Sequence, residues 1–206
     1  GQMLAFEPPR FGQASTLGGA IATAMSGPRR PYAGAARDFV LGVRCVNGRG
    51  ELLGFGGQVM KNVAGYDVSR LMCGAFGTLG VLLDISLKVL PAPPCEITVE
   101  HACDAAQAIV TMNRTAGSPL PLSASSHDGE RLRLRLSGAE SAVSAAAAAL
   151  GGDIVDDAAA YWTAVRDQAL AFFRAPGALW RLSVPPATPP LALGGEQFIE
   201  WGGALR

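Results

Sequence analysis

Residues 61–81 read Lys-Asn-Val-Ala-Gly-Tyr-Asp-Val-Ser-Arg-Leu-Met-Cys-Gly-Ala-Phe-Gly-Thr-Leu-Gly-Val, and this stretch decides the fold. Asp67 or Ser69 can cap a short helix, because a short side-chain oxygen accepts a free N–H of the first turn. Three glycines then recur at every third residue: Gly74, Gly77 and Gly80. Glycines so close together destabilise a regular helix or a central strand. They indicate a tight connection or a backbone that another group approaches closely, and both interpretations stay open.

The segment that follows alternates between apolar and polar residues. One face would carry Leu83, Ile85, Leu87 and Val89, and the other Asp84, Ser86 and Lys88. This period of two predicts a half-buried strand over residues 81–90. Pro91 ends it, since proline lacks the backbone donor that a strand needs.

A second glycine-rich segment lies upstream. Thr16 or the serine before it can cap a helix over about residues 17–25, and Gly27 follows at the position of a C-terminal cap. Gly18 and Gly19 fall in the first turn, where each lowers helix stability by roughly 1 kcal/mol relative to alanine. A helix N-terminus suits a phosphate ligand, so a ligand could explain these glycines. The alternative is a helix of small residues packed tightly on a sheet.

The rest of the chain divides into two regions. Strands over 39–46 and 52–56 are predicted on either side of an Asn47-Gly48-Arg49-Gly50 hairpin turn. After a proline break, the strand–helix–strand–strand–helix–strand order of residues 96–155 predicts an α+β sandwich with helices on one face of an antiparallel sheet. We therefore expect one domain over 1–93 and a second over 94–206.

Further elements are predicted in the second region. Arg131 to Leu136 alternate arginine with leucine, which predicts a strand with a solvated arginine face, although a binding surface is the alternative. A helix over 158–173 and strands over 179–184 and 197–201 complete the pattern.

Composition excludes several classes of protein. The formal net charge is +0 and the pI is about 6.9, which argues against an electrostatic nucleic-acid binder. We find no apolar run of membrane-spanning length and no secretory signal. The four cysteines lack a Cys-x-x-Cys spacing, so we expect reduced thiols in a cytoplasmic protein and no metal site. Because the chain starts Gly-Gln-Met and stops at Gly-Gly-Ala-Leu-Arg, we expect a fragment cut at both ends.

Two long runs, residues 16–42 and 59–81, resemble the FAD-binding fold of vanillyl-alcohol oxidase, p-cresol methylhydroxylase (PCMH) and the D-2-hydroxyacid dehydrogenases. They are most similar to the family of smaller FAD-binding subunits of bacterial glycolate oxidase, and Trp180-Arg181 and 201–206 extend the similarity. The resemblance implies an α+β fold: the second subdomain of a PCMH-type FAD-binding domain, followed by an α+β cap domain with an antiparallel sheet.

The resemblance also implies roles for individual residues toward FAD. Gly18 and Gly19, after Thr16 and before Gly27, would admit the pyrophosphate or ribityl chain. Thr23 would donate a side-chain hydrogen bond, and Gly77 and Val81 would approach the adenosine or flavin edge through main-chain atoms. Weaker candidates are Lys61 and Tyr66, for which a surface lysine and a packed tyrosine are the alternatives.

The family implies a complex with a related larger flavin subunit and an iron–sulfur subunit, oxidising glycolate to glyoxylate. Membrane association would come only through those partners. Phe76 stands where catalytic relatives often carry glutamate, and a histidine-rich metal site is missing, so a non-catalytic interaction subunit is the alternative. Autonomous catalysis on another hydroxyacid is less favoured, and catalytic residues are not assigned. For these residues alone we expect weak or absent FAD binding. Part of the FAD-binding site would be missing, and the ligand would have to order the glycine-rich loops at a cost in conformational entropy.

Overall fold

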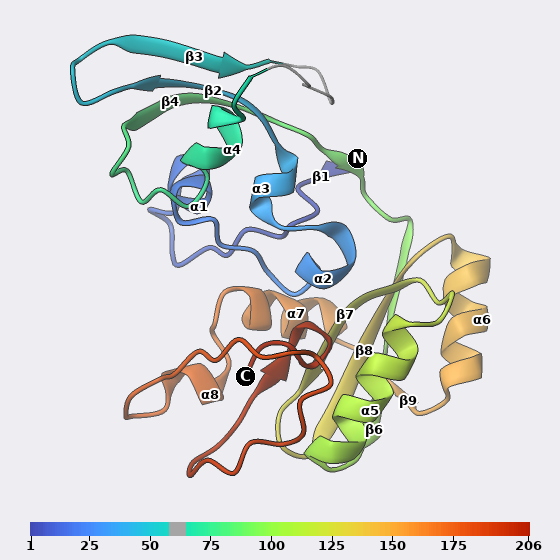
Figure 1. The fold of residues 1–206 in the computed structure, drawn as a ribbon. Coiled ribbons are helices and arrows are strands. Elements are labelled where there is room, and N and C mark those ends of the chain that lie inside the picture. Colours follow the sequence, from blue (N-terminus) through green and yellow to red (C-terminus); the bar gives the residue numbers. More distant parts are fainter. Residues whose placement is uncertain (58–64) are drawn as a thin grey trace. The chain divides into compact units, whose positions relative to one another are not determined.

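The computed structural model describes residues 1–57 and 65–206, which divide into unit 1, Gly1–Ala92, and unit 2, Pro93–Arg206 (Figure 1). The elements of unit 1 are β1 (Gln2–Met3), α1 (Leu17–Thr23), α2 (Arg30–Ala33), α3 (Ala36–Phe39), β2 (Val40–Val46), β3 (Leu52–Gly56), α4 (Val68–Met72), β4 (Val81–Leu87) and β5 (Leu90–Pro91). An antiparallel sheet in the order β3-β2-β4 forms its framework, and β1 pairs with β5. The predicted hairpin between β2 and β3 is confirmed.

The core of unit 1 lies on one face of the three-stranded sheet. Phe6 and Phe39 are buried with their ring centroids 5.5 Å apart, and Ile21 of α1 and Val43 of β2 pack in the same cluster. The apolar side chains of α1 and of alternate β2 residues therefore hold the helix against the sheet.

The predicted faces of β4 are partly wrong. Leu82 and Ile85 pack against the core, whereas Leu83 and Val89 are exposed. The register explains this, because Cys45 pairs with Leu82 and the next residue along β2, Arg44, pairs with Asp84. Leu83 is thus the extra residue of a β-bulge, and a bulge breaks the period of two.

Unit 2 contains β6 (Cys95–Ala102), α5 (Ala105–Ala116), β7 (Leu122–His127), β8 (Arg131–Gly138), α6 (Glu140–Leu150), β9 (Asp153–Ile154), α7 (Ala158–Arg166), α8 (Ala171–Arg174), β10 (Ile199–Glu200) and the 3₁₀ turn η1 (Trp201–Gly203). All strands pair antiparallel in the order β10-β7-β8-β6-β9. Asp104 caps α5 and forms a reciprocal capping box with Gln107, as the Asp-x-x-Gln spacing favours. The mixed helix and antiparallel-sheet class predicted from the sequence is confirmed.

Both faces of the unit 2 sheet are covered. Helices α5 and α6 lie against the face that carries Leu132, Leu134 and Leu136, all buried. Helix α7 covers the other face, where Trp162 Nε1 donates to Thr98 Oγ1 at 2.9 Å. The prediction of a solvated arginine face is therefore wrong for Arg133 and Arg135, whose guanidinium groups lie over aromatic rings of α7.

Three further predictions for unit 2 are corrected. The helix expected over 158–173 is divided into α7 and α8, with Gln168 at a left-handed φ of 52° between them. The strand expected over 179–184 is reduced to an isolated bridge between Ser183 and Leu205. The last strand is shorter than expected and comprises Ile199–Glu200.

Candidate functional site

The two glycine-rich segments, some 50 residues apart in the sequence, lie against each other in unit 1. The backbone N–H of Gly74 donates to the carbonyl of Ile21 at 3.0 Å, and that of Phe76 to the carbonyl of Ala22 at 2.9 Å. A Cβ on Gly74 would stand 3.1 Å from the Ala24 side chain, and its φ of +85° favours glycine. We call α1 together with residues 74–81 the glycine site.

The first turn of α1 is formed as the sequence predicts. Thr16 is the N-cap, and its Oγ1 accepts the N–H of Gly19 at 3.0 Å. Thr23 donates its hydroxyl to the carbonyls of Gly19 and Ala20, at 2.8 and 3.2 Å, so that hydroxyl stabilises the helix itself. The predicted end of the helix is wrong, since the C-cap is Ala24 in a left-handed conformation and not the Ser26-Gly27 pair.

The glycines of unit 1 fall into two groups. A Cβ on Gly80 would stand 2.6 Å from the Val46 carbonyl oxygen, and one on Gly42 2.8 Å from the Gly57 nitrogen, so close backbone approach explains both. Gly18 and Gly77 have open space where a Cβ would be, with the first neighbour of Gly18 4.0 Å away. Gly77 has a φ of +74°, a backbone conformation that favours glycine. At Gly18 neither the backbone conformation nor a close neighbour explains why the residue is glycine.

At Gly18 and Gly77, where a Cβ would meet open space, a ligand has room to approach the backbone. Gly19 differs from Gly18, because a Cβ there would stand 3.3 Å from Thr16 Oγ1, a tight contact with the capping side chain. A flexible cofactor that lies along α1 could approach the main chain at Gly18, next to the Thr16 side chain. The residues present therefore fit a flavin nucleotide that is held through backbone contacts, as the resemblance implies.

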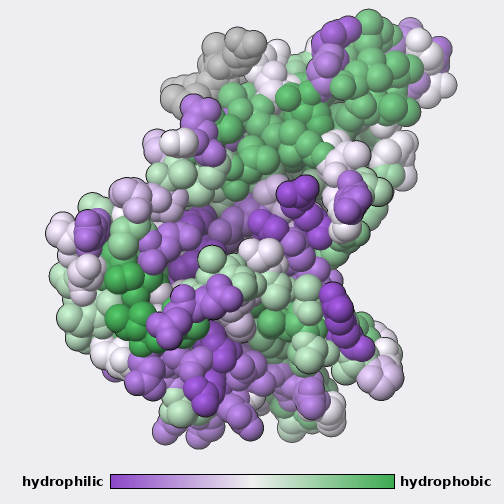
Figure 2. Space-filling model, turned by 180° about the vertical axis from the view of Figure 1, so that it is seen from behind, coloured by the Kyte–Doolittle hydropathy of each residue, from purple (hydrophilic) through white to green (hydrophobic). Residues whose placement is uncertain are grey.

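Exposed apolar side chains occur within these segments and next to them in the sequence. Tyr66 is 96% exposed, Phe76 71% and Val81 63%, and Leu17 and Leu79 are also exposed. Figure 2 shows a broad hydrophobic area on unit 1. Exposed apolar patches of this kind mark ligand or protein contacts.

The remaining predicted residues lie as follows. Gly27 is buried, and its N–H donates to the Phe6 carbonyl at 2.9 Å, a contact that orders the chain after α1. Lys61 lies outside the described residues. Next to the site, burial raises the pKa of the Cys73 thiol, which keeps it protonated at neutral pH.

Sequence reasoning missed Phe76 as part of this arrangement. Its φ of +53° is left-handed, an uncommon conformation for a bulky residue, and its N–H is one of the two ties to α1. The signal was its position between Gly74 and Gly77, where the chain reverses.

Two other kinds of site are absent from residues 1–57 and 65–206. No group of three or more histidine, cysteine, aspartate or glutamate side chains is placed to hold a metal ion there. Within the same ranges, no helix combines the length and the hydropathy that crossing a bilayer requires.

Comparison with known proteins finds a relative along the whole chain. The chain is 48% identical over all of its 206 residues to glycolate oxidase subunit GlcE of Escherichia coli K12. The chain is homologous to GlcE along its whole length. It spans 58% of that relative's length, and residues 1–56 match the FAD binding domain family. The resemblance predicted from the sequence is thus confirmed, and the domain match supports FAD, the predicted cofactor.

Other relatives match a smaller part of this chain. Glycolate oxidase subunit GlcD of Bacillus subtilis is 39% identical over 85 residues, 41% of this chain and 18% of that protein. D-Lactate dehydrogenase of Anaerostipes hadrus is 37% identical over 98 residues, 48% of this chain and 21% of that protein. A solved alkyldihydroxyacetonephosphate synthase matches with a TM-score of 0.59 at 19% identity, over 73% of this chain and 33% of that one. This last likeness concerns the fold alone.

Proposed function

We propose that this chain is part of an FAD-binding subunit of a multi-subunit glycolate oxidase, in which glycolate or a similar 2-hydroxy acid is oxidised to the 2-oxo acid. Its homology to GlcE over all 206 residues is the main support. The structural observation that carries the proposal is the open backbone at Gly18, where neither the packing of unit 1 nor the backbone conformation requires glycine.

In this proposal, unit 1 supplies the backbone surface for the flavin and unit 2 is the cap domain. Gly18 and Gly19 let a pyrophosphate or ribityl chain approach α1, while Thr16 holds the first turn. Gly77 and Val81 contribute main-chain contacts, and Tyr66 and Phe76 contribute apolar surface. A flavin bound there supplies the hydride-accepting chemistry, and the protein orients the reacting groups.

Partners and location belong to the same proposal. Two relatives carry the word subunit in their names, which supports assembly of this chain with other subunits. We propose a related larger flavin subunit and an iron–sulfur subunit as the electron acceptors, and a cytoplasmic location with membrane association through those partners.

A test compares Gly18→Leu with Gly48→Leu in the full-length subunit. Gly48 is exposed in the β2–β3 turn with open space around it, so it is a matched control in the same unit. Leucine at position 18 favours the helix by up to about 1 kcal/mol over glycine. We expect Gly18→Leu to keep or raise the free energy of unfolding and to lower the bound flavin, measured by visible absorbance, at least about tenfold.

The outcomes separate the leading function from the alternative. Gly48→Leu should keep full flavin content. Full flavin in both variants would show that the cofactor does not lie along α1. A second candidate function, an interaction subunit that does not use flavin, is favoured by the exposed Phe76 and Val81. It requires complex activity to survive in Gly18→Leu, whereas the leading proposal requires activity to fall while assembly persists.

A further inference from the structure

One edge of the unit 1 sheet lacks the features by which proteins protect an edge strand. An edge strand presents backbone N–H and C=O groups to further strands, and short strands, charges, proline or bulges limit such pairing. Strand β3 lies at one edge of the order β3-β2-β4 (Figure 1), and its five residues, Leu52–Gly56, include no charged residue and no proline. Its register with β2 runs without a bulge. The composition of β3 itself therefore permits a further strand to pair with it.

The opposite edge of the same sheet is protected. Strand β4 contains the bulge at Leu83, and the side chain of its central Asp84 is 61% exposed. A bulge twists an edge strand away from a neighbour, and a charge disfavours pairing with another strand. In the smaller ladder of unit 1, β1 and β5 are two residues long and β5 ends in Pro91. Protection is thus the rule in this unit, and β3 departs from it.

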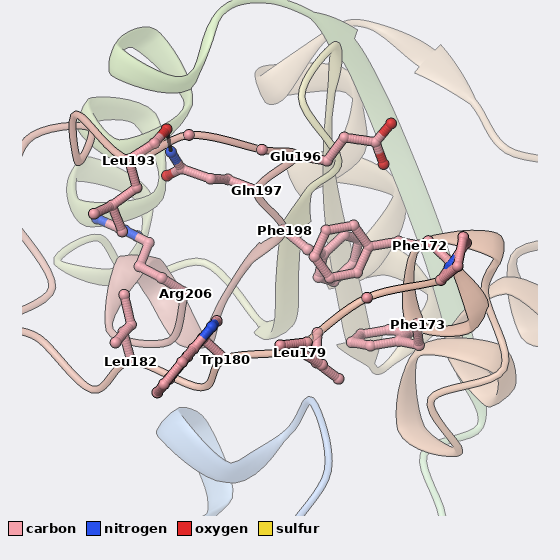
Figure 3. Close-up of a pocket in the computed structure, with 16 residues that line it drawn as sticks. Phe172, Phe173, Leu179, Trp180, Leu182, Leu193, Glu196, Gln197, Phe198 and Arg206 are labelled. Atoms are coloured by element: carbon pink, nitrogen blue, oxygen red, sulfur yellow. Dashed lines mark hydrogen bonds between the residues drawn. The ribbon is translucent and has the colours of Figure 1, made fainter.

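The edges of the unit 2 sheet are protected as well. Both edge strands, β9 and β10, are two residues long. Glu200 of β10 also exchanges backbone hydrogen bonds with Leu205, at 2.9 and 3.2 Å, on the side away from β7. Leu182 and Arg206, which lie side by side in Figure 3, continue this pairing with two backbone hydrogen bonds of 2.9 Å. Among the sheet edges of the described residues, β3 alone has none of these protections.

The hydrogen bonds of the hairpin determine which groups β3 presents at its edge. In an antiparallel pair, opposed residues alternate between hydrogen-bonded and non-hydrogen-bonded pairs. The Asn47 N–H donates to the Glu51 carbonyl at 3.1 Å, directly before β3. The Gly57 N–H donates to the Leu41 carbonyl at 3.1 Å, directly after it. By this alternation, three residues of β3 turn their N–H and C=O groups away from β2: Leu52, Gly54 and Gly56.

We propose that β3 pairs antiparallel with β3 of a second copy of this chain, centred on Gly54, so that the two three-stranded sheets become one. This register places Leu53 opposite Phe55 of the second copy in a non-hydrogen-bonded pair, where side chains approach most closely. Leu52, which is 57% exposed, falls opposite Gly56 of the second copy.

The strand suits a second copy because it is complementary to itself. The aliphatic and aromatic pair of Leu53 and Phe55 occurs twice about the two-fold axis, and no like charges within β3 meet across it. Such a contact is closed, since it uses the same edge of both copies. The pairing does not involve bound flavin, so the inference is independent of the proposed function.

The test measures the mass of the full-length subunit by sedimentation velocity over a range of concentrations. Pairing along one short strand gives a small interface, so we expect a reversible dimer with a Kd of roughly 1–100 μM. A subunit that stays monomeric up to about 1 mM would overturn the proposal, and β3 would then be covered by another segment or partner.

Charge variants at the two-fold axis decide whether the partner is a second copy. Gly54→Lys and Gly54→Glu each place like charges opposite one another, so each should raise the dimer Kd at least about tenfold. An equimolar mixture of the two should restore the dimer, because the opposed charges then attract. Position 54 has room for a side chain, since a Cβ there would lie 4.0 Å from its first neighbour, Arg44 Cγ.

The matched control is Gly54→Ala, which adds a side chain without a charge. It should keep the dimer, and all three variants should show little change in Tm. A dimer that persists in both charged variants would overturn the register centred on Gly54. A mixture of the folded charged variants that stays monomeric would overturn the pairing of β3 with itself.

Discussion

The two sheets each carry a cross-strand pair of arginine and carboxylate at almost the same distance, but in opposite surroundings. In unit 1, Arg44 Nη1 lies 2.7 Å from Asp84 Oδ2, and the two side chains are 57% and 61% exposed. In unit 2, Arg133 Nε lies 2.6 Å from Glu100 Oε2, and the two side chains are 13% and 12% exposed. The two ion pairs therefore have nearly the same geometry, but we expect them to contribute differently to the free energy of unfolding.

The difference comes from what covers each face. Helix α7 lies over the unit 2 pair, with the Arg133 guanidinium 4.4 Å from the Tyr161 ring centroid and the hydroxyl of that tyrosine 2.8 Å from Ser126 Oγ. An exposed ion pair is screened by water and contributes little, whereas breaking a covered one leaves a charge without solvent. The covering helix, more than the strands, sets the value of each pair.

The largest expected effect on stability comes from truncating Trp162, a side chain of α7 that covers the unit 2 sheet. Trp162→Ala should lower the free energy of unfolding of unit 2 by about 3–5 kcal/mol, because it leaves a cavity and an unpaired Thr98 hydroxyl. Denaturant unfolding followed by the two remaining tryptophans, Trp180 and Trp201, reports on unit 2, since all three tryptophans lie there. The control Val110→Ala, on an exposed position of α5 in the same unit, should cost less than about 1 kcal/mol. Similar losses of unfolding free energy in both variants would contradict the inference that the helix covering the unit 2 sheet sets its stability.

A smaller effect is expected from breaking the pairs one at a time. Glu100→Gln should cost about 1.5–3 kcal/mol, since Arg133 then keeps its charge under α7 without that partner. Asp84→Asn should cost less than about 1 kcal/mol, and the cost should shrink further in high salt. Circular dichroism during denaturation at two salt concentrations measures both. Equal costs would show that α7 does not shield its pair.

The smallest expected effect is the pH dependence of the stabilisation that Asp128 provides. Burial raises the pKa of Asp128, but hydrogen bonds from Arg133 and from the N–H groups of Arg131 and Glu130 outweigh it, so the pKa lies below its usual value. The unfolded value is about 3.9, so the stabilisation is present above about pH 4 and is lost as pH falls through the folded pKa.

The corresponding variant is Asp128→Asn. Its difference in unfolding free energy from the unmodified protein should be constant near neutral pH and should shrink below about pH 4. Asp157→Asn, at an exposed position without a side-chain cap bond, is the control. A difference for Asp128→Asn that persists unchanged at acidic pH would mean that its hydrogen bonds to Arg133 do not form in solution.

Local chemistry made part of this structure predictable. The caps at Thr16, Asp67 and Asp104 formed as expected, since each places a side-chain oxygen over its own helix. Whether a face is covered was not predictable from alternation alone. Arg135 is buried because α7 packs over it. The alternation of residues within a strand does not show which distant helix will cover one of its faces. The bulge at Leu83 likewise depends on the register with β2.

The same limits apply to the candidate sites. No local pattern predicts the meeting of α1 with residues 74–76, and the family resemblance implied only that both segments contact the same cofactor. The burial of Arg206 depends on its backbone bridge to Leu182, a pairing that no short stretch of the sequence predicts. Long-range pairing, invisible to short windows, creates both.

The ties between Gly74 and Ile21 and between Phe76 and Ala22 use only main-chain atoms. Any residue other than proline can supply an N–H, and every residue supplies a carbonyl. The two segments are therefore aligned without any contribution from the side chains of Ile21, Ala22 and Phe76, although Gly74 itself is restricted by its φ of +85°. They cannot accept an insertion or deletion between positions 74 and 76, because that would shift one donor past its acceptor. The alignment of the junction thus depends on its length and on glycine at position 74 more than on its other side chains.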